Sequence, residues 1–378
     1  MNKINISTTI YNIIKFIYIN TIEYIFTILT IFYSKKPKNH SNKILFIAND
    51  GIGDNIIRIS ILRKYIEFFK TEDIYFLVSN DSGQRDFFYL VFPEKEKLIS
   101  CYSKNIARNP LYRLSKINEL NQYKFYKTIL LHTKSERVTN IFKKYIHTKE
   151  LYYHFSENPC SYTLKEDIEL FQKVTNITLT INEIRPDLTY LIKNESNTYR
   201  LPKEFIAIGI GSSAIARTYP VSSFLTVLEW LAINGQYLVF LGKGQSDSMY
   251  YNTLIKHSPL IAKHSTNYID KLSLSESLMI LKQSKLFVGI ESGLFNAAYV
   301  LNVPFAVIYG GGHYGRFIHP HDYSAYISNR MECFGCNWEK CGYGNIRLKP
   351  ARCITSITPE QVIESISHLL LINTINIQ

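Results

Sequence analysis

The sequence lacks the features that would place it in several common classes of protein. The turn after its first strand, 49–54, does not have the G-x-G-x-x-G pattern of a dinucleotide fingerprint. The chain also has no zinc-finger helix and no basic run with interleaved aromatic residues, so nucleic acid is not expected as a partner. The longest uncharged run near the N-terminus, 24–34, has 11 residues, against the roughly 20 that a membrane-spanning helix needs.

Cysteine and acidic residues are also in short supply. Six cysteines in 378 residues do not make a disulfide framework, and no cleavable secretory signal is evident, so a reducing, cytoplasmic setting is expected. Lysine and arginine number 43 against 31 acidic residues, a formal net charge of +12. This excess favours anionic partners such as nucleotides, phosphorylated lipids or a membrane surface.

What is present is a globular composition, 46% hydrophobic and 20% charged, in a chain long enough for two domains. Residues 1–40 form an apolar and basic extension, in which a helix with a narrow polar stripe runs into Lys35-Lys36-Pro37-Lys38. Such a helix can lie in a membrane interface near anionic lipid. It can equally pack on the protein's own body or on another subunit, and a spanning helix is a third alternative.

Beyond residue 40 the chain repeats a unit of apolar strand, polar loop and helix. Strands are expected at 43–48, 74–78 and 128–131 in a first domain, 41–190, and at 205–209, 237–241 and 286–288 in a second, 203–378. Loops rich in glycine and hydroxyl groups follow the strands of the second domain. This pattern predicts an α/β fold with doubly wound parallel sheets and ligand loops at the carboxyl ends of the strands.

Asp54 is the first candidate functional residue, because it follows the first strand in the turn Asn49-Asp50-Gly51-Ile52-Gly53-Asp54. An aspartate there can cap the following helix, or it can face the ligand edge of the sheet as a general base. Both roles remain open from spacing alone.

Two loops of the second domain have the composition of an anion site. Ser212, Ser213 and Arg217 follow one strand, and hydroxyl groups, backbone N–H groups and a guanidinium suit oxyanion binding. A second loop, Glu291-Ser292-Gly293, opens a helix whose first amides would point over the strand ends. Gly310 to Gly312 then follow the next strand, where they would let the backbone pass close to a ligand.

Four cysteines near the C-terminus have the spacing of a metal finger. Cys333, Cys336, Cys341 and Cys353 lie within about twenty residues, and four thiolates would close a tetrahedral structural site for zinc or iron. Free buried thiols or redox-sensitive pairs are the alternatives.

In their order and spacing these blocks resemble glycosyltransferase family 9, the ADP-heptose:lipopolysaccharide heptosyltransferases. The resemblance spans roughly residues 43–370 and rests on these blocks: 44–62 with Gly53-Asp54, 209–220 with Arg217, 288–309 with Glu291, then Arg316, Pro320 and 357–362. It implies a GT-B fold, two Rossmann-like domains facing across a cleft, with the acceptor at 41–190 and the donor at 203–378. It also implies inverting, metal-independent transfer with no cofactor, and the sequence has no Asp-x-Asp with which to hold a metal–diphosphate.

The resemblance assigns roles to individual residues. Asp54 matches the general base and Arg217 the cation that neutralises the departing diphosphate. The expected donor contacts are Ser212, Ser213, Gly242, Glu291, Ser292, Gly293 and Asn296. Glu291 and Asn296 depart from the family, which usually has aspartate and histidine at these positions, so another sugar is conceivable.

The function implied is transfer of heptose from ADP-heptose to a lipopolysaccharide core acceptor, by an enzyme peripheral at the inner face of the bacterial inner membrane. The alternatives are a transferase using another nucleotide sugar or a protein acceptor, and a catalytically silent nucleotide-sugar-binding paralogue. The sequence leaves the oligomeric state open.

Overall fold

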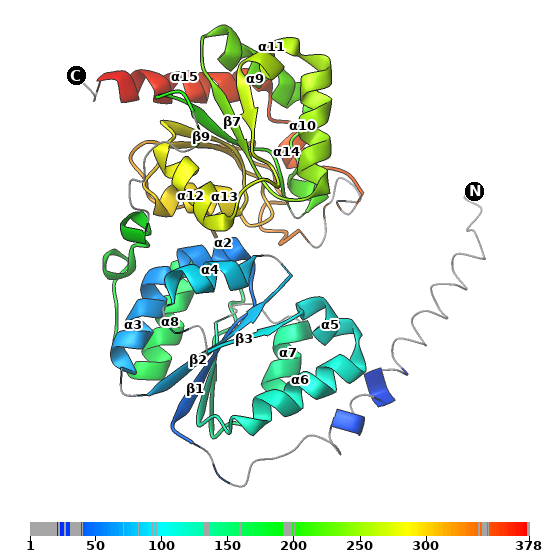
Figure 1. Ribbon diagram of the computed structural model, residues 1–378, viewed down its shortest axis with the longest axis vertical. Coiled ribbons are helices and arrows are strands. Elements are labelled where there is room, and N and C mark those ends of the chain that lie inside the picture. The colour runs from blue at the N-terminus through cyan, green and yellow to red at the C-terminus, as the bar shows by residue number, and fades with distance from the viewer. Residues whose placement is uncertain are drawn as a thin grey trace. The chain divides into compact units, whose positions relative to one another are not determined.

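The computed structural model describes most of the chain after residue 40. The described residues are 21, 23–25, 28–30, 39, 41–70, 72–81, 83–92, 94, 97–131, 137–158, 160–191, 199, 201–212, 214–338, 341, 346 and 348–375. Most of the extension 1–40 therefore lies outside the described residues, and so does Ser213. These residues divide into two compact units, each built around its own parallel sheet (Figure 1).

The first unit comprises residues 1–50 and 69–155 and holds a five-stranded sheet of order β3-β2-β1-β4-β5. Its strands are β1 Lys43–Ala48, β2 Asp73–Ser79, β3 Leu98–Cys101, β4 Lys127–Leu130 and β5 Glu150–Tyr153. Its helices are α4 Gln84–Val91, α5 Ser103–Arg108, α6 Pro110–Gln122 and α7 Arg137–Tyr145. The central strand β1 is buried over Ile44 to Ala48, as an apolar run in a covered parallel sheet must be.

The second unit comprises residues 51–68 and 156–378 and holds a six-stranded sheet of order β11-β10-β9-β6-β7-β8. Its strands are β6 Ile206–Gly209, β7 Leu238–Leu241, β8 Ser265–Asn267, β9 Leu286–Ile290, β10 Phe305–Ile308 and β11 Ser324–Ile327. Every neighbouring pair is parallel, so the predicted doubly wound α/β fold is confirmed. The strand order reverses between β6 and β9, and in such sheets ligands bind at the carboxyl ends beside this switch point.

The larger helices of the second unit are α9 Val221–Ile233, α10 Gln245–His257, α12 Leu274–Gln283, α13 Gly293–Val300 and α15 Pro359–Ile375. The short ones are α11 Pro259–Lys263 and α14 Arg352–Thr355, with 3-10 turns at Asn182–Ile184, Thr189–Leu191 and Ile215–Arg217. Some of these helices begin at a local capping signal in the sequence. Ser273, for example, caps α12 in a reciprocal box with Glu276.

Three helices from the predicted first domain belong to the second unit. They are α2 Ile52–Ile57, α3 Ile59–Phe68 and α8 Thr163–Thr175. Helix α2 approaches α13 so closely that a Cβ atom on Gly53 would lie 3.2 Å from the Cα atom of Gly293. Two glycines therefore bring the turn that carries Asp54 against the helix that follows β9.

The N-terminal extension is described only in fragments, of which 23–25 and 28–30 are helical. The Glu23 carboxylate accepts two hydrogen bonds from the guanidinium of Arg113, with N–O distances of 3.1 and 2.9 Å, and also pairs with Arg137. At this point the extension packs on the first unit's own helices. No helix among the described residues is both long and apolar enough to cross a membrane.

Candidate functional site

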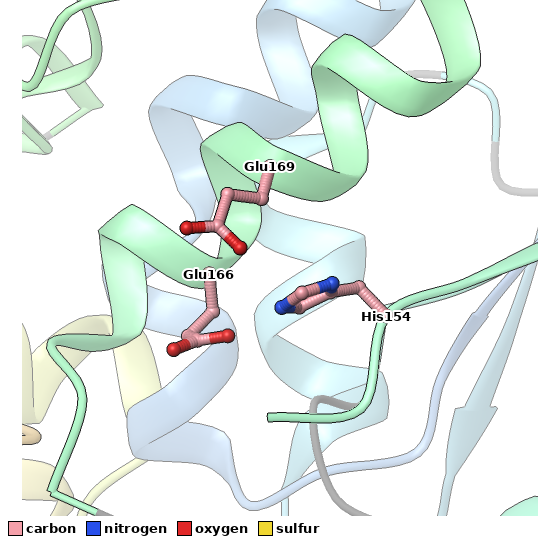
Figure 2. A group of neighbouring side chains, drawn as sticks. All are labelled: His154, Glu166 and Glu169. Atoms are coloured by element: carbon pink, nitrogen blue, oxygen red, sulfur yellow. The ribbon is translucent and has the colours of Figure 1, made fainter. Parts of the chain in front are cut away.

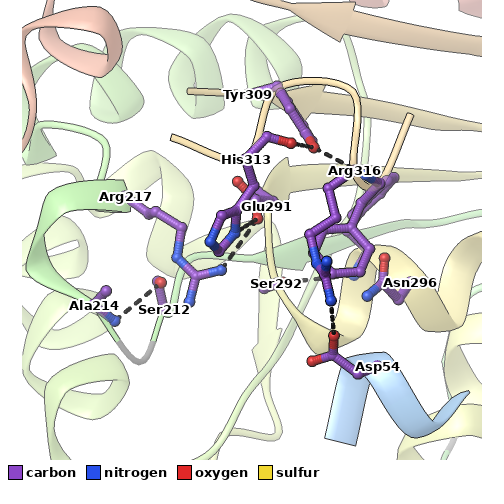
Figure 3. A network of polar contacts seen from close by, with 12 residues as sticks. Asp54, Ser212, Ala214, Arg217, Glu291, Ser292, Asn296, Tyr309, His313 and Arg316 are labelled. Atoms are coloured by element: carbon purple, nitrogen blue, oxygen red, sulfur yellow. Dashed lines mark hydrogen bonds and ion pairs between the residues drawn. The ribbon is translucent and has the colours of Figure 1, made fainter. Parts of the chain in front are cut away.

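Asp54 lies in the first turn of α2 with its side chain partly exposed. The N-cap position of α2 is Gly51, and no side chain caps the helix. The nearest cation is Arg316, whose Nη2 atom lies 3.7 Å from Oδ1 of Asp54, while the guanidinium is almost fully buried (Figure 3). A partly exposed carboxylate thus lies beside a buried cation.

Arg316 is fixed by the chain on both sides of it. Its N–H donates to the carbonyl oxygen of His313 at 2.9 Å, and its own carbonyl accepts from the N–H of Thr163 at 3.1 Å. The segment after β10 is therefore tied to the start of α8, and the Arg316 side chain leaves this anchored backbone toward Asp54.

Glu291 immediately follows β9 and forms the centre of a second charged group. Its Oε1 atom lies 3.3 Å from Nη1 of Arg217 and 3.3 Å from Nδ1 of His313, and the carboxylate is only 3% exposed (Figure 3). Burial alone would raise the pKa of Glu291, but the hydrogen bond from His313 and the charge of Arg217 outweigh it, so the pKa lies below its ordinary value. The carboxylate stays ionised and holds both groups.

Ser292 and Gly293 form the start of α13, as predicted. The Ser292 hydroxyl accepts the N–H of Phe295 at 3.5 Å and caps the helix. The remaining first-turn amides make this end of the helix suited to an anion.

Asn296, one turn into α13, is held from behind by a buried histidine. Its Oδ1 atom lies 3.2 Å from Nε2 of His319, and Nδ1 of His319 lies 3.1 Å from the hydroxyl of Tyr162. The imidazole stacks on Tyr299 with ring centroids 4.2 Å apart. Burial lowers the pKa of His319 to about 3, so the ring is neutral and orients the Asn296 amide.

The other predicted donor contacts lie on the loops after β6 and β7. The Ser212 hydroxyl accepts the N–H of Ala214 at 3.2 Å, and Ser213 lies outside the described residues. At Gly242 a Cβ atom would lie 2.5 Å from a carboxylate oxygen of Asp247, and at Gly211 only 2.0 Å. Both glycines therefore make room for the buried Asp247 carboxylate, which accepts the N–H of Lys243 at 3.2 Å.

The glycine run 310–312 differs from the prediction in what occupies the space beside it. A Cβ atom on Gly311 would lie 2.1 Å from the ring of Phe334, and one on Gly312 would lie 2.2 Å from the ring of Trp338. The absent side chains leave room for two aromatic rings of the cysteine-rich segment. The glycines therefore join that segment to the loop that carries His313.

The cysteine-rich segment brings its four thiols near one another. Burial raises the pKa of Cys353, and the thiols of Cys333, Cys336 and Cys341 raise it further. Burial likewise raises the pKa of Cys333, which also hydrogen-bonds to Cys341. Among the described residues, no three of these sulfur atoms lie within 4.8 Å of one another.

Sequence reasoning assigned no role to His313, Arg316, His319 or Asp247. The first three follow β10 at intervals of three residues, and this spacing after a strand was a usable signal. Figure 2 shows Glu166 and Glu169 one turn apart on α8, where Glu166 accepts the Ser156 hydroxyl at 2.9 Å. His154, also drawn there, belongs to the first unit.

Comparison with known proteins identifies a family from the sequence and a fold from the solved structures. The family model of glycosyltransferase family 9 (heptosyltransferase) matches residues 147–346. The sequence comparison with curated proteins gave no match.

The solved structures include three informative relatives. ADP-heptose LPS heptosyltransferase II of E. coli has a TM-score of 0.61 at 17% identity, over 87% of this chain and 98% of that chain. A family 9 glycosyltransferase of Veillonella parvula has a TM-score of 0.62 at 14% identity, over 89% and 99%. TibC, an iron-containing dodecameric glycosyltransferase of enterotoxigenic E. coli, has a TM-score of 0.53 at 16% identity, over 89% and 80%. These likenesses confirm the predicted GT-B fold class.

Proposed function

Because the chain belongs to glycosyltransferase family 9 and is therefore a glycosyltransferase, we propose that it transfers heptose from ADP-heptose to a lipopolysaccharide core acceptor, with inversion and without a catalytic metal. The observation that carries the proposal is the pairing of Asp54 with Arg316 and of Glu291 with Arg217 and His313. Arg217, Glu291, His313 and Arg316 follow the neighbouring strands β6, β9 and β10, and Asp54 meets Arg316 from α2 (Figure 3).

In the proposed reaction Asp54 is the general base. Its carboxylate removes the proton of the acceptor hydroxyl, whose oxygen attacks the anomeric carbon from the side opposite the diphosphate. The bond from that carbon to the diphosphate oxygen breaks as the new bond forms, which inverts the configuration. Arg316, whose backbone is anchored on both sides, pairs with this carboxylate through its guanidinium and holds it in place.

Negative charge then develops on the departing diphosphate. Arg217 and the first-turn amides of α13 stabilise it, and such prearranged donors supply much of the catalysis in displacements of this kind. Ser212 and Ser213 contribute hydroxyl donors. Because Gly242 has no side chain, the loop after β7 does not project into the donor site. The second oxygen of Glu291 is buried and has no hydrogen-bond partner among the described residues, so a sugar hydroxyl would satisfy it. Asn296 offers its amide, oriented by His319, to the same sugar.

Substitution of the base tests this proposal. We expect Asp54→Asn to lower kcat by about 100- to 10,000-fold, the usual contribution of a positioned base, while ADP binding is retained. Asp86→Asn is the matched control, because Asp86 is an exposed first-turn aspartate of another helix, α4. Equal loss in both variants, or no loss in Asp54→Asn, would refute the assignment.

The alternatives separate by nucleotide and acceptor. Calorimetry with ADP, UDP, GDP and CMP identifies the donor class, and preference for a nucleotide other than ADP would exclude heptose carried by ADP. Transfer to a protein and not to lipopolysaccharide core would select the protein-acceptor alternative. Binding of ADP with no transfer to any acceptor would indicate a silent paralogue.

A structural zinc or iron ion at Cys333, Cys336, Cys341 and Cys353 is the second part of the proposal. The fit is chemical, since four neighbouring thiols are soft ligands and Cys353 already accepts the N–H of Gly311 at 3.4 Å. The similar TibC structure is described as iron-containing. Metal analysis of the purified protein should give about one ion per chain, and Cys341→Ser should lower that content; a metal-free, equally stable protein would exclude the site.

We also propose that residues 1–40 hold the enzyme at the membrane surface, as its basic charge and a lipid-linked acceptor favour. The test is sedimentation with vesicles containing anionic phospholipid, using the full chain and a chain lacking residues 1–40. Unchanged vesicle binding after the truncation would exclude this role.

A further inference from the structure

His313 and Arg217 converge on a single atom. Both lie 3.3 Å from Oε1 of Glu291, which is 3% exposed, whereas the imidazole is 18% exposed and the guanidinium 16% exposed. Both nitrogen-bearing groups are thus partly exposed, while the carboxylate that they share is buried (Figure 3). A carboxylate that only balanced Arg217 would not require the second contact.

Hydrogen bonds to its carbonyl and two neighbouring aromatic rings hold His313 in this position. The His313 carbonyl accepts the Tyr309 hydroxyl at 3.0 Å and the N–H of Arg316 at 2.9 Å. The rings of Phe317 and Trp338 stand edge-on to the imidazole, each with its centroid 6.1 Å away. Among the described residues, charged groups that face the imidazole include Glu291, which follows β9, and Arg217 from the 3-10 turn before α9.

The net charge of Glu291, Arg217 and His313 together depends on whether the imidazole is protonated. Ionised Glu291 and Arg217 cancel, so a neutral imidazole gives the group no net charge and a protonated one gives it +1. Because Nδ1 of His313 faces the carboxylate and donates to it, Nε2 accepts a hydrogen bond in the neutral ring and donates one in the protonated ring. An anion that binds here is therefore favoured by protonation of His313.

We propose that His313 is a second cation for the departing diphosphate, and that it takes up a proton when a nucleoside diphosphate binds. The proposal rests on the proposed function, because it adds to the same donor site. As the sugar–oxygen bond breaks, its electron pair goes to the diphosphate oxygen, and protonated His313 and Arg217 hydrogen-bond to the diphosphate. The proton of the acceptor hydroxyl goes to Asp54, so His313 transfers none.

Calorimetry of ADP binding in two buffers of different ionisation enthalpy tests this directly. We expect the wild-type chain to take up a fraction of a proton at pH 7.5, and its affinity to fall as pH rises from 6 to 9. His313→Asn keeps a donor toward Glu291 and removes the distal N–H. It should lose the proton uptake and bind ADP about 10- to 100-fold more weakly at pH 6.5, as expected for a lost charged hydrogen bond.

Two further variants make the result decisive. His313→Lys carries a fixed cation, so it should bind ADP with no proton uptake near neutral pH and keep its affinity at pH 9 better than wild type does. His257→Asn is the control, an exposed histidine on α10 whose Nδ1 faces the carbonyl of Thr253, and it should behave as wild type. Thermal unfolding of each variant checks that it is folded.

The outcomes separate this inference from the proposed function. Preference for UDP or GDP, with proton uptake lost in His313→Asn, would support His313 and discard the ADP donor. ADP binding with unchanged uptake and affinity in folded His313→Asn would overturn the inference and leave the function standing. Absence of binding to every nucleoside diphosphate and to inorganic diphosphate would overturn both.

Discussion

Gly53→Ala is the sharpest test of how the base is positioned. Gly53 lies inside α2, immediately before Asp54, where alanine would ordinarily stabilise the helix by about 1 kcal/mol. The added Cβ atom would, however, lie 2.7 Å from Nδ2 of Asn296 and 3.2 Å from the Cα atom of Gly293. The first distance is about 0.7 Å short of ordinary contact, and the second involves backbone that cannot rotate away.

The two effects oppose each other, and their magnitudes decide the sign. Overpacking of a tight contact costs about 1–3 kcal/mol, so the net change in unfolding free energy should be a loss of up to about 2 kcal/mol. For a unit of this size that corresponds to a fall in Tm of up to about 8 °C. The larger effect should be catalytic, since displacing a reacting group by about 1 Å can cost about 100-fold in rate.

Steady-state transfer assays and thermal unfolding measure the two effects separately. Gly293→Ala should be milder, because its Cβ atom would lie 3.1 Å from the Cγ2 methyl of Ile52, which is short by only a few tenths of an ångström, and backbone lies no nearer than 3.7 Å. Thr226→Ala on the exposed face of α9 is the control for helix propensity alone. A Gly53→Ala protein that is more stable and fully active would refute the argument that these glycines set the place of Asp54.

Two further predictions concern buried titratable groups. The pKa of His319 falls from 6.5 to about 3 on folding, so its contribution to stability is full above pH 6.5 and is lost as the pH falls toward 3, by up to about 1.4 kcal/mol per pH unit. His319→Gln should therefore flatten the pH dependence of Tm between pH 6.5 and 5. An unchanged slope would contradict this. Arg58 Nε lies 2.9 Å from the buried Asp167 carboxylate, so Arg58→Met would leave this carboxylate buried without its cation and should cost about 3–5 kcal/mol of unfolding free energy. The double variant Arg58→Met with Asp167→Leu should recover most of that loss in denaturant unfolding.

Much of the fold could be read from the sequence because its strands are continuous apolar runs. The first strand was predicted over its observed length, 43–48, and β9 was predicted from the run that begins at Leu286. The segment 84–126 gave no motif, yet it folds as α4, β3, α5 and α6, since its helices carry amphipathic rather than chemical signals. Strand β8 has only three polar residues, so no apolar pattern marks it.

The site was predictable residue by residue but not as a set. Loop composition pointed to Arg217 and Glu291 separately, whereas their shared contact with His313 depends on where three strands end. The grouping of 51–68 with the second unit depends on contacts between distant parts of the sequence, which no local pattern encodes. They include the close approach of Gly53 and Gly293, the buried pair of Arg58 and Asp167, and the packing of Tyr65 on Phe171. Gly310 to Gly312 were expected to face a ligand, because sequence alone does not show that Phe334 and Trp338 fill the space.

The assignment of α2 and α3 to the second unit also bears on the order in which the protein can fold during synthesis. Helix α3 ends at Phe68 and α13 begins at Gly293, 225 positions later. At about 5–20 residues per second a ribosome needs roughly 11–45 s to make that stretch. Until then the Gly53 turn has no α13 to pack against, although the five strands of the first unit have already emerged. The segment that carries the base is thus among the first parts of the chain to be made and among the last to reach its native contacts.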